Sequence, residues 1–158
     1  MAFQFLCSAH RQQLAQDASV AQARWDEWMA AGRRAFAERE WRMAVRYLGC
    51  SFELSDLLLT SERVPSLTSL DRFMVSGHFL AECFANTGNT DLQQHCLLAV
   101  HHRLLKVLRS PDGRALPLQR NVEFSLQMLG RFYEEEGNRD AFEHCQRESR
   151  RLLQRCYH

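Results

Sequence analysis

The chain has 158 residues, of which 46% are apolar and 25% are charged, a composition typical of a globular domain with one core. Its 20 Lys and Arg residues nearly balance its 19 Asp and Glu residues, so the net charge of +1 predicts no general attraction to nucleic acid or to an anionic membrane. We find no stretch of about 18 apolar residues and no basic, apolar leader, so we expect no membrane span and a cytoplasmic protein with reduced thiols.

The basic residues are almost all arginine, because Lys106 is the single lysine, and the sequence contains no isoleucine. This usage is typical of a GC-rich genome, and we expect a bacterial source.

Residues 1–21 form a leading segment outside the repeats described below. Phe3, Leu6, His10 and Leu14 follow the 3/4 spacing of one helical face, which predicts a helix from 3 to about 20. Such a helix would cover one open end of a helical stack.

Residues 22–64 are predicted to form the first of three helical hairpins. Its helices are expected from Val20 to Ala37 and from Trp41 to Ser61, and Pro65 ends the second. The stripe that includes Trp25, Trp28 and Gly32 is expected to face the core.

Residues 65–113 are predicted to form the second hairpin. Its first helix begins near Leu67 after a capping Ser66 or Thr68, and Gly88 suits a left-handed helix end. The second helix is expected from Thr90 to Arg109, and the turn residues 110–113 follow it.

Residues 114–158 are predicted to form the third hairpin, which begins near Pro117 and turns at Gly137-Asn138. No segment shows the period-2 alternation of a strand, so the predicted fold class is all-α.

The hairpins share a motif at an interval of 49 residues. Gly32, Ala81 and Gly130 align, and the later copies both carry His-Cys, at 95–96 and 144–145. A small residue at a fixed place lets two helices approach closely, so the pattern predicts a stack of similar units.

This unit resembles the tetratricopeptide repeat. The matching positions are Trp28, Ala31, Gly32, Trp41, Ala44 and Leu48, then Leu80, Ala81, Phe84, Gly88 and Leu97, then Leu129, Gly130, Tyr133 and Gly137. The resemblance implies one domain over residues 1–158, a right-handed α-solenoid of three hairpins and an N-terminal helix.

The resemblance also implies a concave face lined by the first helix of each hairpin, which binds a partner peptide or helix. By helical phase its side chains are Met29, Arg33, Phe36, His78, Glu82, Asn86, Phe124, Gln127, Arg131 and Glu134. Arg33, Glu82 and Arg131 stand where relatives that clamp a terminal carboxylate place asparagine, which favours an internal segment of the partner.

We therefore expect a non-enzymatic protein-binding adaptor or scaffold without a cofactor. Two alternatives stay open: a bacterial secretion chaperone for one client, and self-assembly into a homo-oligomer. Motifs for a nucleophile, a phosphate loop or a zinc protease are absent.

Other sites are less well supported by the sequence. Cys7 and His10 have C-x-x-H spacing, but the adjacent His-Cys pairs at 95–96 and 144–145 point about 100° apart on a helix, so we predict no metal site and keep a metal-binding regulator as a third alternative. The basic segment 147–155 follows three acidic residues, and its charges are expected to stabilise the end of the last helix.

Overall fold

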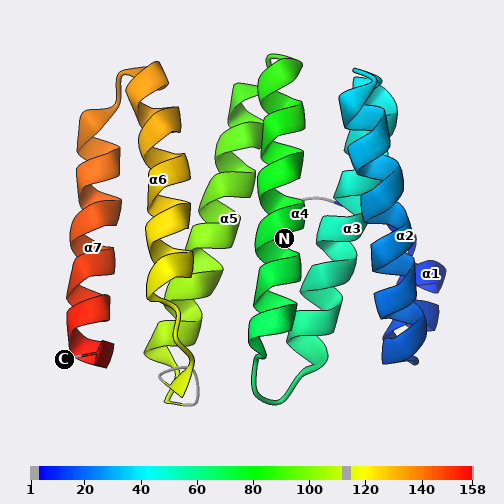
Figure 1. The fold of residues 1–158 in the computed structure, drawn as a ribbon, viewed down its shortest axis with the longest axis horizontal. Helices are drawn as coiled ribbons and strands as arrows, with labels where there is room; N and C mark the ends of the chain where they lie inside the picture. The colour runs from blue at the N-terminus through cyan, green and yellow to red at the C-terminus, as the bar shows by residue number, and fades with distance from the viewer. Residues whose placement is uncertain (1–3, 112–114, 158) are drawn as a thin grey trace. The chain divides into compact units, whose positions relative to one another are not determined.

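The computed structural model describes residues 4–111 and 115–157, and these residues form seven α-helices (Figure 1). The helices are α1 (Ser8–Ala15), α2 (Ala18–Ala37), α3 (Trp41–Ser61), α4 (Leu67–Asn86), α5 (Thr90–Arg109), α6 (Gln119–Glu136) and α7 (Arg139–Tyr157). No strand occurs within the described ranges, which confirms the all-α prediction. None of the described helices is long and apolar enough to cross a membrane.

Most helix ends lie at the residues that the sequence signals. Helices α3 and α5 have their predicted bounds, and Ser66 caps α4 by accepting a hydrogen bond from the Ser69 amide at 3.1 Å. Gly88 and Gly137 adopt φ values of 73° and 69°, in the left-handed conformation that ends a helix. The predicted turn at 110–113 extends into residues 112–114, which lie outside the described part.

The prediction of one helix from 3 to about 20 is wrong. Helix α1 begins only at Ser8, and Asp17 starts a new helix by accepting hydrogen bonds from the amides of Ser19 and Val20. An Asp at an N-cap competes with helix continuation, so the chain changes direction between α1 and α2.

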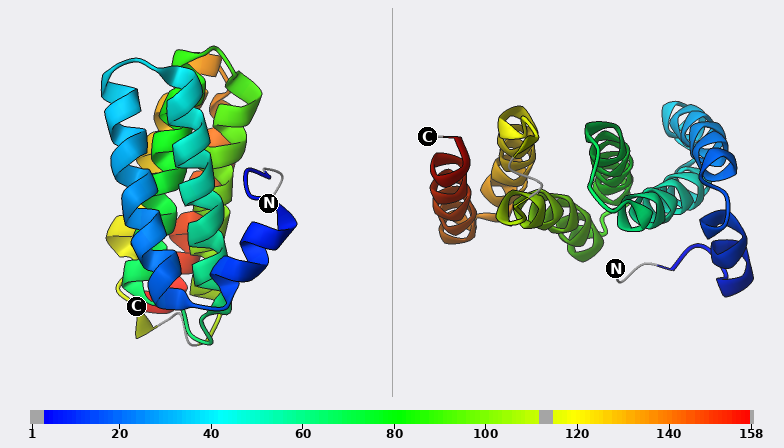
Figure 2. Two further views of the ribbon diagram at one scale, coloured as in Figure 1. Left: turned by 90° about the vertical axis from the view of Figure 1, so that its right-hand side faces the viewer. Right: turned by 90° about the horizontal axis from the view of Figure 1, so that it is seen from below.

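The chain divides into two compact units, residues 1–96 and 97–158, with the boundary inside α5. In unit 1, α3 packs against both α2 and α4, while α1 contacts α2 and α3. Figure 2 shows α2, α3 and α4 end-on, with α1 in dark blue beside them. The ring of Phe52 lies 4.8 Å from that of Phe73 between α3 and α4.

Close approach between α2 and α3 depends on Gly32. A Cβ atom at Gly32 would lie 2.7 Å from Cδ2 of Leu48, which is shorter than a carbon–carbon contact allows. The aligned glycine of the third hairpin, Gly130, would place a Cβ 3.2 Å from the Phe142 ring, between α6 and α7. The small residues of the repeat therefore lie where the two helices of a hairpin meet.

A buried carboxylate holds the segment before α1 against α3. Glu53 is 1% exposed, and its Oε2 accepts hydrogen bonds from the amides of Phe5 at 2.8 Å and Leu6 at 2.7 Å. Its Oε1 accepts from Nη1 of Arg11 at 2.8 Å. Gly49 leaves room for the Phe5 ring, since a Cβ there would lie 2.5 Å from ring carbons.

Unit 2 contains α6, α7 and the α5 residues from Leu97 onward. Its α5 and α7 lie side by side, because Cys156 Sγ donates to the Leu108 carbonyl at 3.4 Å and His101 reaches Ser149. Each pair is 48 residues apart, close to the repeat interval. The Tyr157 hydroxyl accepts from the Leu118 amide, which ties the end of α7 to the start of α6.

Candidate functional site

One arginine and three aromatic side chains of unit 1 contact one another in a set here called the Arg33 cluster: Arg33, Phe36, Trp41 and Phe79. The guanidinium carbon of Arg33 lies 5.5 Å from the centroid of the Phe79 ring, a cation–π distance. Phe36 meets Phe79 edge-on at 5.5 Å and Trp41 edge-on at 5.2 Å. Three of these side chains are half-buried and Arg33 is exposed, so the cluster has both a fixed geometry and an accessible face.

Three elements bring the Arg33 cluster together. Arg33 and Phe36 come from the last turns of α2, and Phe79 comes from α4. Trp41 opens α3 after a tight turn in which Arg39 takes a φ of 58°, and the Glu40 amide donates to the Ala35 carbonyl at 2.9 Å. This turn, with Arg39 in the left-handed conformation, reverses the direction of the chain between α2 and α3, so that Trp41 lies against Phe36.

Two of the predicted site residues in unit 1 are buried and offer no surface to a partner. Met29 is 2% exposed because it shares the packing stripe of Gly32 and Ala35 on α2. His78 is 8% exposed because α4 is covered around most of its circumference, and this burial lowers the pKa of His78 to about 4. Helical phase from the sequence alone placed both side chains on the wrong face.

The last turn of α4 holds the remaining predicted residues of unit 1. Glu82 is half-buried, and Asn86 is exposed. The Nδ2 atom of Asn86 donates to the Glu82 carbonyl at 2.8 Å, so this amide group is bound to its own helix.

In unit 2 the four predicted residues lie on one exposed stripe of α6: Phe124, Gln127, Arg131 and Glu134. Their spacings of three, four and three residues place them on one helical face. Phe124 is 49% exposed, which makes it one of the most exposed large apolar side chains described. The stripe therefore combines an apolar group with an amide and both signs of charge.

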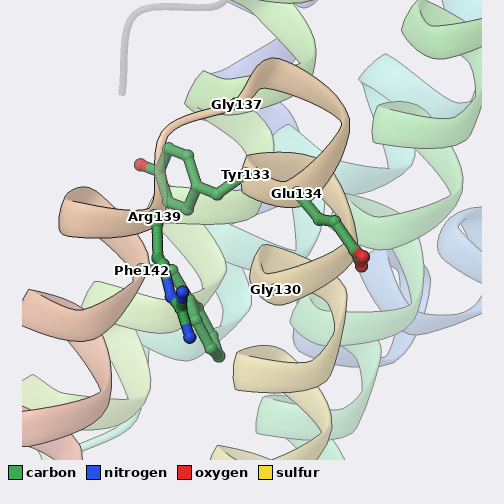
Figure 3. A pocket seen from close by; sticks show the side chains of 6 residues that line it. All are labelled: Gly130, Tyr133, Glu134, Gly137, Arg139 and Phe142. Carbon is green, nitrogen blue, oxygen red and sulfur yellow. The ribbon is translucent and has the colours of Figure 1, made fainter.

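A pocket of about 500 Å³ opens where α6 turns into α7 (Figure 3). Its lining comprises Gly130, Tyr133, Glu134, Gly137, Arg139 and Phe142. Gly130 and Gly137 have no side chains to fill this space, and Figure 3 shows the side chains of Arg139 and Phe142 extending from α7 toward α6. Glu134 is the one predicted site residue that reaches it.

Sequence reasoning missed Phe79, Arg139 and Phe142. Phe79 follows the buried His78, and its partner Phe36 is 43 residues away, so only the three-dimensional contact reveals it. Phe142 carried a signal, since it stands two 49-residue intervals after Ala44 and so puts a large ring where the first hairpin has a small residue.

A buried histidine in unit 2 has two serine partners. His101 Nδ1 lies 2.8 Å from Ser125 Oγ, and Nε2 lies 3.1 Å from Ser149 Oγ. Burial lowers the pKa of His101 to about 4, assisted by His102 and opposed by Glu148, so the ring is neutral at pH 7. A neutral ring has one N–H and one lone pair, so one serine accepts and the other donates.

This Ser-His-Ser network does not have the properties of a catalytic site. All three residues are at most 1% exposed, and each serine hydroxyl also lies within hydrogen-bond distance of a backbone carbonyl of its own helix. A nucleophile needs access to its substrate, and these hydroxyls belong to buried residues. The network joins α5, α6 and α7.

Metal and thiol chemistry has no assembled site in the described residues, where no three His, Cys, Asp or Glu side chains converge. Cys7 Sγ accepts a hydrogen bond from the His10 amide at 3.4 Å, which makes Cys7 the cap of α1. Burial raises the pKa of the Cys83 thiol to about 12 and also raises that of Cys96, so these thiols stay protonated.

Comparisons with protein-family models, with curated proteins and with solved structures found no match to this chain. The assignment of function therefore depends on the two exposed surfaces, the Arg33 cluster and the α6 stripe.

Proposed function

We propose that this chain is a protein-interaction module, an adaptor or scaffold that binds a peptide or helix of a partner through the first helices of its hairpins. The observation that supports the proposal is the Arg33 cluster. Arginine and large aromatic side chains contribute most of the binding energy in protein interfaces, and this cluster presents them already fixed by mutual ring contacts.

The α6 stripe supplies a second surface of matching character. Phe124 offers apolar contact, while Arg131 and Glu134 offer charges of both signs. A partner that pairs with both signs of charge is an internal peptide segment or an amphipathic helix, in line with the near-neutral chain.

We further propose that the three hairpins form a right-handed α-solenoid related to tetratricopeptide repeats. Contacts between equivalent helices support this arrangement: α2 meets α4 through residues 36 and 79, and α5 meets α7 through residues 101 and 149. In such a solenoid α2, α4 and α6 would line one continuous face.

A pull-down from lysate of the native host, analysed by mass spectrometry, tests the proposal. The test variant is the double substitution Arg33→Ala/Arg131→Ala, and the matched control is Arg34→Ala/Arg120→Ala, which removes exposed arginines of the same two helices. We expect one dominant partner that the test variant loses and the control keeps. Equal capture by both variants, or recovery of the chain alone as an oligomer, would contradict the proposed surface.

A further inference from the structure

Helix α7 carries a further, separate surface, whose cations are used neither by the packing of the helix nor by the proposed function. His144, Arg147 and Arg151 are exposed, and together with Glu148 they line a hollow of about 370 Å³. We call this surface the α7 hollow. Its residues occupy positions i, i+3, i+4 and i+7, so all four lie on one face of the helix.

The packing of α7 does not require these cations. The helix is held in unit 2 by a different stripe, of which Cys145, Ser149 and Leu152 are buried. The dipole of the helix does not explain them either, since its effect is confined to the last turn, where Arg155 is the basic residue.

The positive charge of the α7 hollow is not neutralised from within. Glu148 is the one acidic residue in the lining, and it forms an ion pair with Arg109 of α5. Across residues 4–111 and 115–157, no ion pair or hydrogen bond engages the side chains of Arg147 or Arg151. Both guanidinium groups therefore have all their donors available for a ligand.

The spacing of the arginines matches an extended acidic peptide. Arg147 and Arg151 are separated by four residues, a rise of about 6 Å along the helix. Alternate side chains on one face of an extended peptide are about 6.5 Å apart. Each planar guanidinium can bind a carboxylate through two parallel hydrogen bonds.

We propose that the α7 hollow binds an extended acidic peptide segment that carries carboxylates at alternate positions. One carboxylate contacts Arg147, the next contacts Arg151, and His144 extends the site toward the start of the helix. A nucleic-acid strand fits less well, because it carries a charge on every nucleotide, whereas a peptide can limit its carboxylates to two and place neutral residues beside Asp140 and Glu143.

Fluorescence anisotropy of a fluorescein-labelled ten-residue peptide that carries two Glu residues separated by one Ser, with Ser and Gly elsewhere, titrated with the full chain at low salt, tests this site. The double variant Arg147→Gln/Arg151→Gln is expected to bind about tenfold more weakly, because two charge-assisted contacts are lost. The control Arg150→Gln removes an exposed arginine of the same helix that does not line the α7 hollow, so its affinity is expected to equal that of the wild type.

Three outcomes would overturn the proposal. The first is no saturable binding by the wild type, and the second is equal affinity of the wild type and the double variant. The third is tighter binding of a ten-residue oligothymidylate than of the peptide, which would assign the surface to nucleic acid. Circular dichroism of each variant confirms that the exposed substitutions leave the helices intact.

Discussion

Replacing Glu53 by Ala is expected to lower the free energy of unfolding by about 3 kcal/mol, because it removes the acceptor that fixes the N-terminal segment to α3. Three donors depend on this carboxylate: the amides of Phe5 and Leu6 on Oε2, and Arg11 on Oε1. A hydrogen bond to a charged group contributes about 1.5–3 kcal/mol when it is buried.

The loss in free energy of unfolding has an upper limit, because the segment before α1 can detach from α3 so that its amides form hydrogen bonds with water. Release would expose Leu6, which is 3% exposed in the fold, and the burial of a leucine contributes about 1.5–3 kcal/mol. The expected 3 kcal/mol therefore corresponds to undocking of the segment, and helices α2 to α4 are expected to remain folded.

The variant Glu53→Gln separates the two roles of the carboxylate. A glutamine keeps one oxygen for the amides of Phe5 and Leu6 but turns an NH₂ group toward Arg11. The expected loss is about 1 kcal/mol, since the Arg11 side chain is 38% exposed and its ion pair is partly screened.

Urea unfolding of the wild type and both Glu53 variants measures these costs, and amide hydrogen exchange of Phe5 and Leu6 reports docking directly. Arg24→Ala is the control, because Arg24 pairs with Glu27 on an exposed face. A free energy of unfolding for Glu53→Ala within about 0.5 kcal/mol of the wild type, the size of an ordinary surface substitution, would show that the carboxylate does not hold the segment. An equal loss in the Gln and Ala variants would show that the oxygen kept by glutamine contributes nothing.

Other predictions concern the buried histidines and the repeat glycines. His101 and His78 both have a pKa of about 4 in the fold, below the ordinary 6.5, so the unfolded chain binds protons first and stability falls as the pH drops from 6.5 toward 4. Each histidine is expected to lower the free energy of unfolding at pH 5 by about 2 kcal/mol. Urea unfolding at pH 7 and at pH 5 measures the sum of the two contributions. A urea midpoint that does not change with pH would be inconsistent with buried neutral rings. Gly32→Ala is expected to cost about 1–3 kcal/mol because its Cβ would meet Leu48 at 2.7 Å, whereas Gly130→Ala is expected to cost less because its nearest contact is 3.2 Å. Thermal unfolding compares the stabilities of the two glycine variants. Equal losses of stability would show that the distance from the added Cβ atom to its nearest neighbour does not determine the loss.

The sequence predicted the helices well wherever a turn residue marked their ends. Ser66, Gly88 and Gly137 act locally, so their effect can be read without knowledge of the fold. The 49-residue repeat likewise predicted where small residues lie between helices, as Gly32 shows. The extended segment before α1 could not be predicted, because the residue that captures it, Glu53, is more than 40 positions away.

The candidate site was predicted only in part, for a related reason. Helical phase shows which residues share one face of a helix, but which faces other helices cover depends on the fold. Met29 is buried because it shares the packing stripe of α2 with Gly32, and His78 is buried because α4 is covered around most of its circumference. Arg33 and Phe36 stay on the surface, and the contact that fixes them, with Phe79, joins two different hairpins.

The proposed binding of a partner on the first helices can be measured by hydrogen exchange with mass spectrometry, with and without the partner captured in the pull-down. We expect slower exchange in peptides from the end of α2, from α4 and from α6 when the partner is bound. Slower exchange confined to α3, α5 and α7 would place the partner on the other helices and rule out the proposed surface.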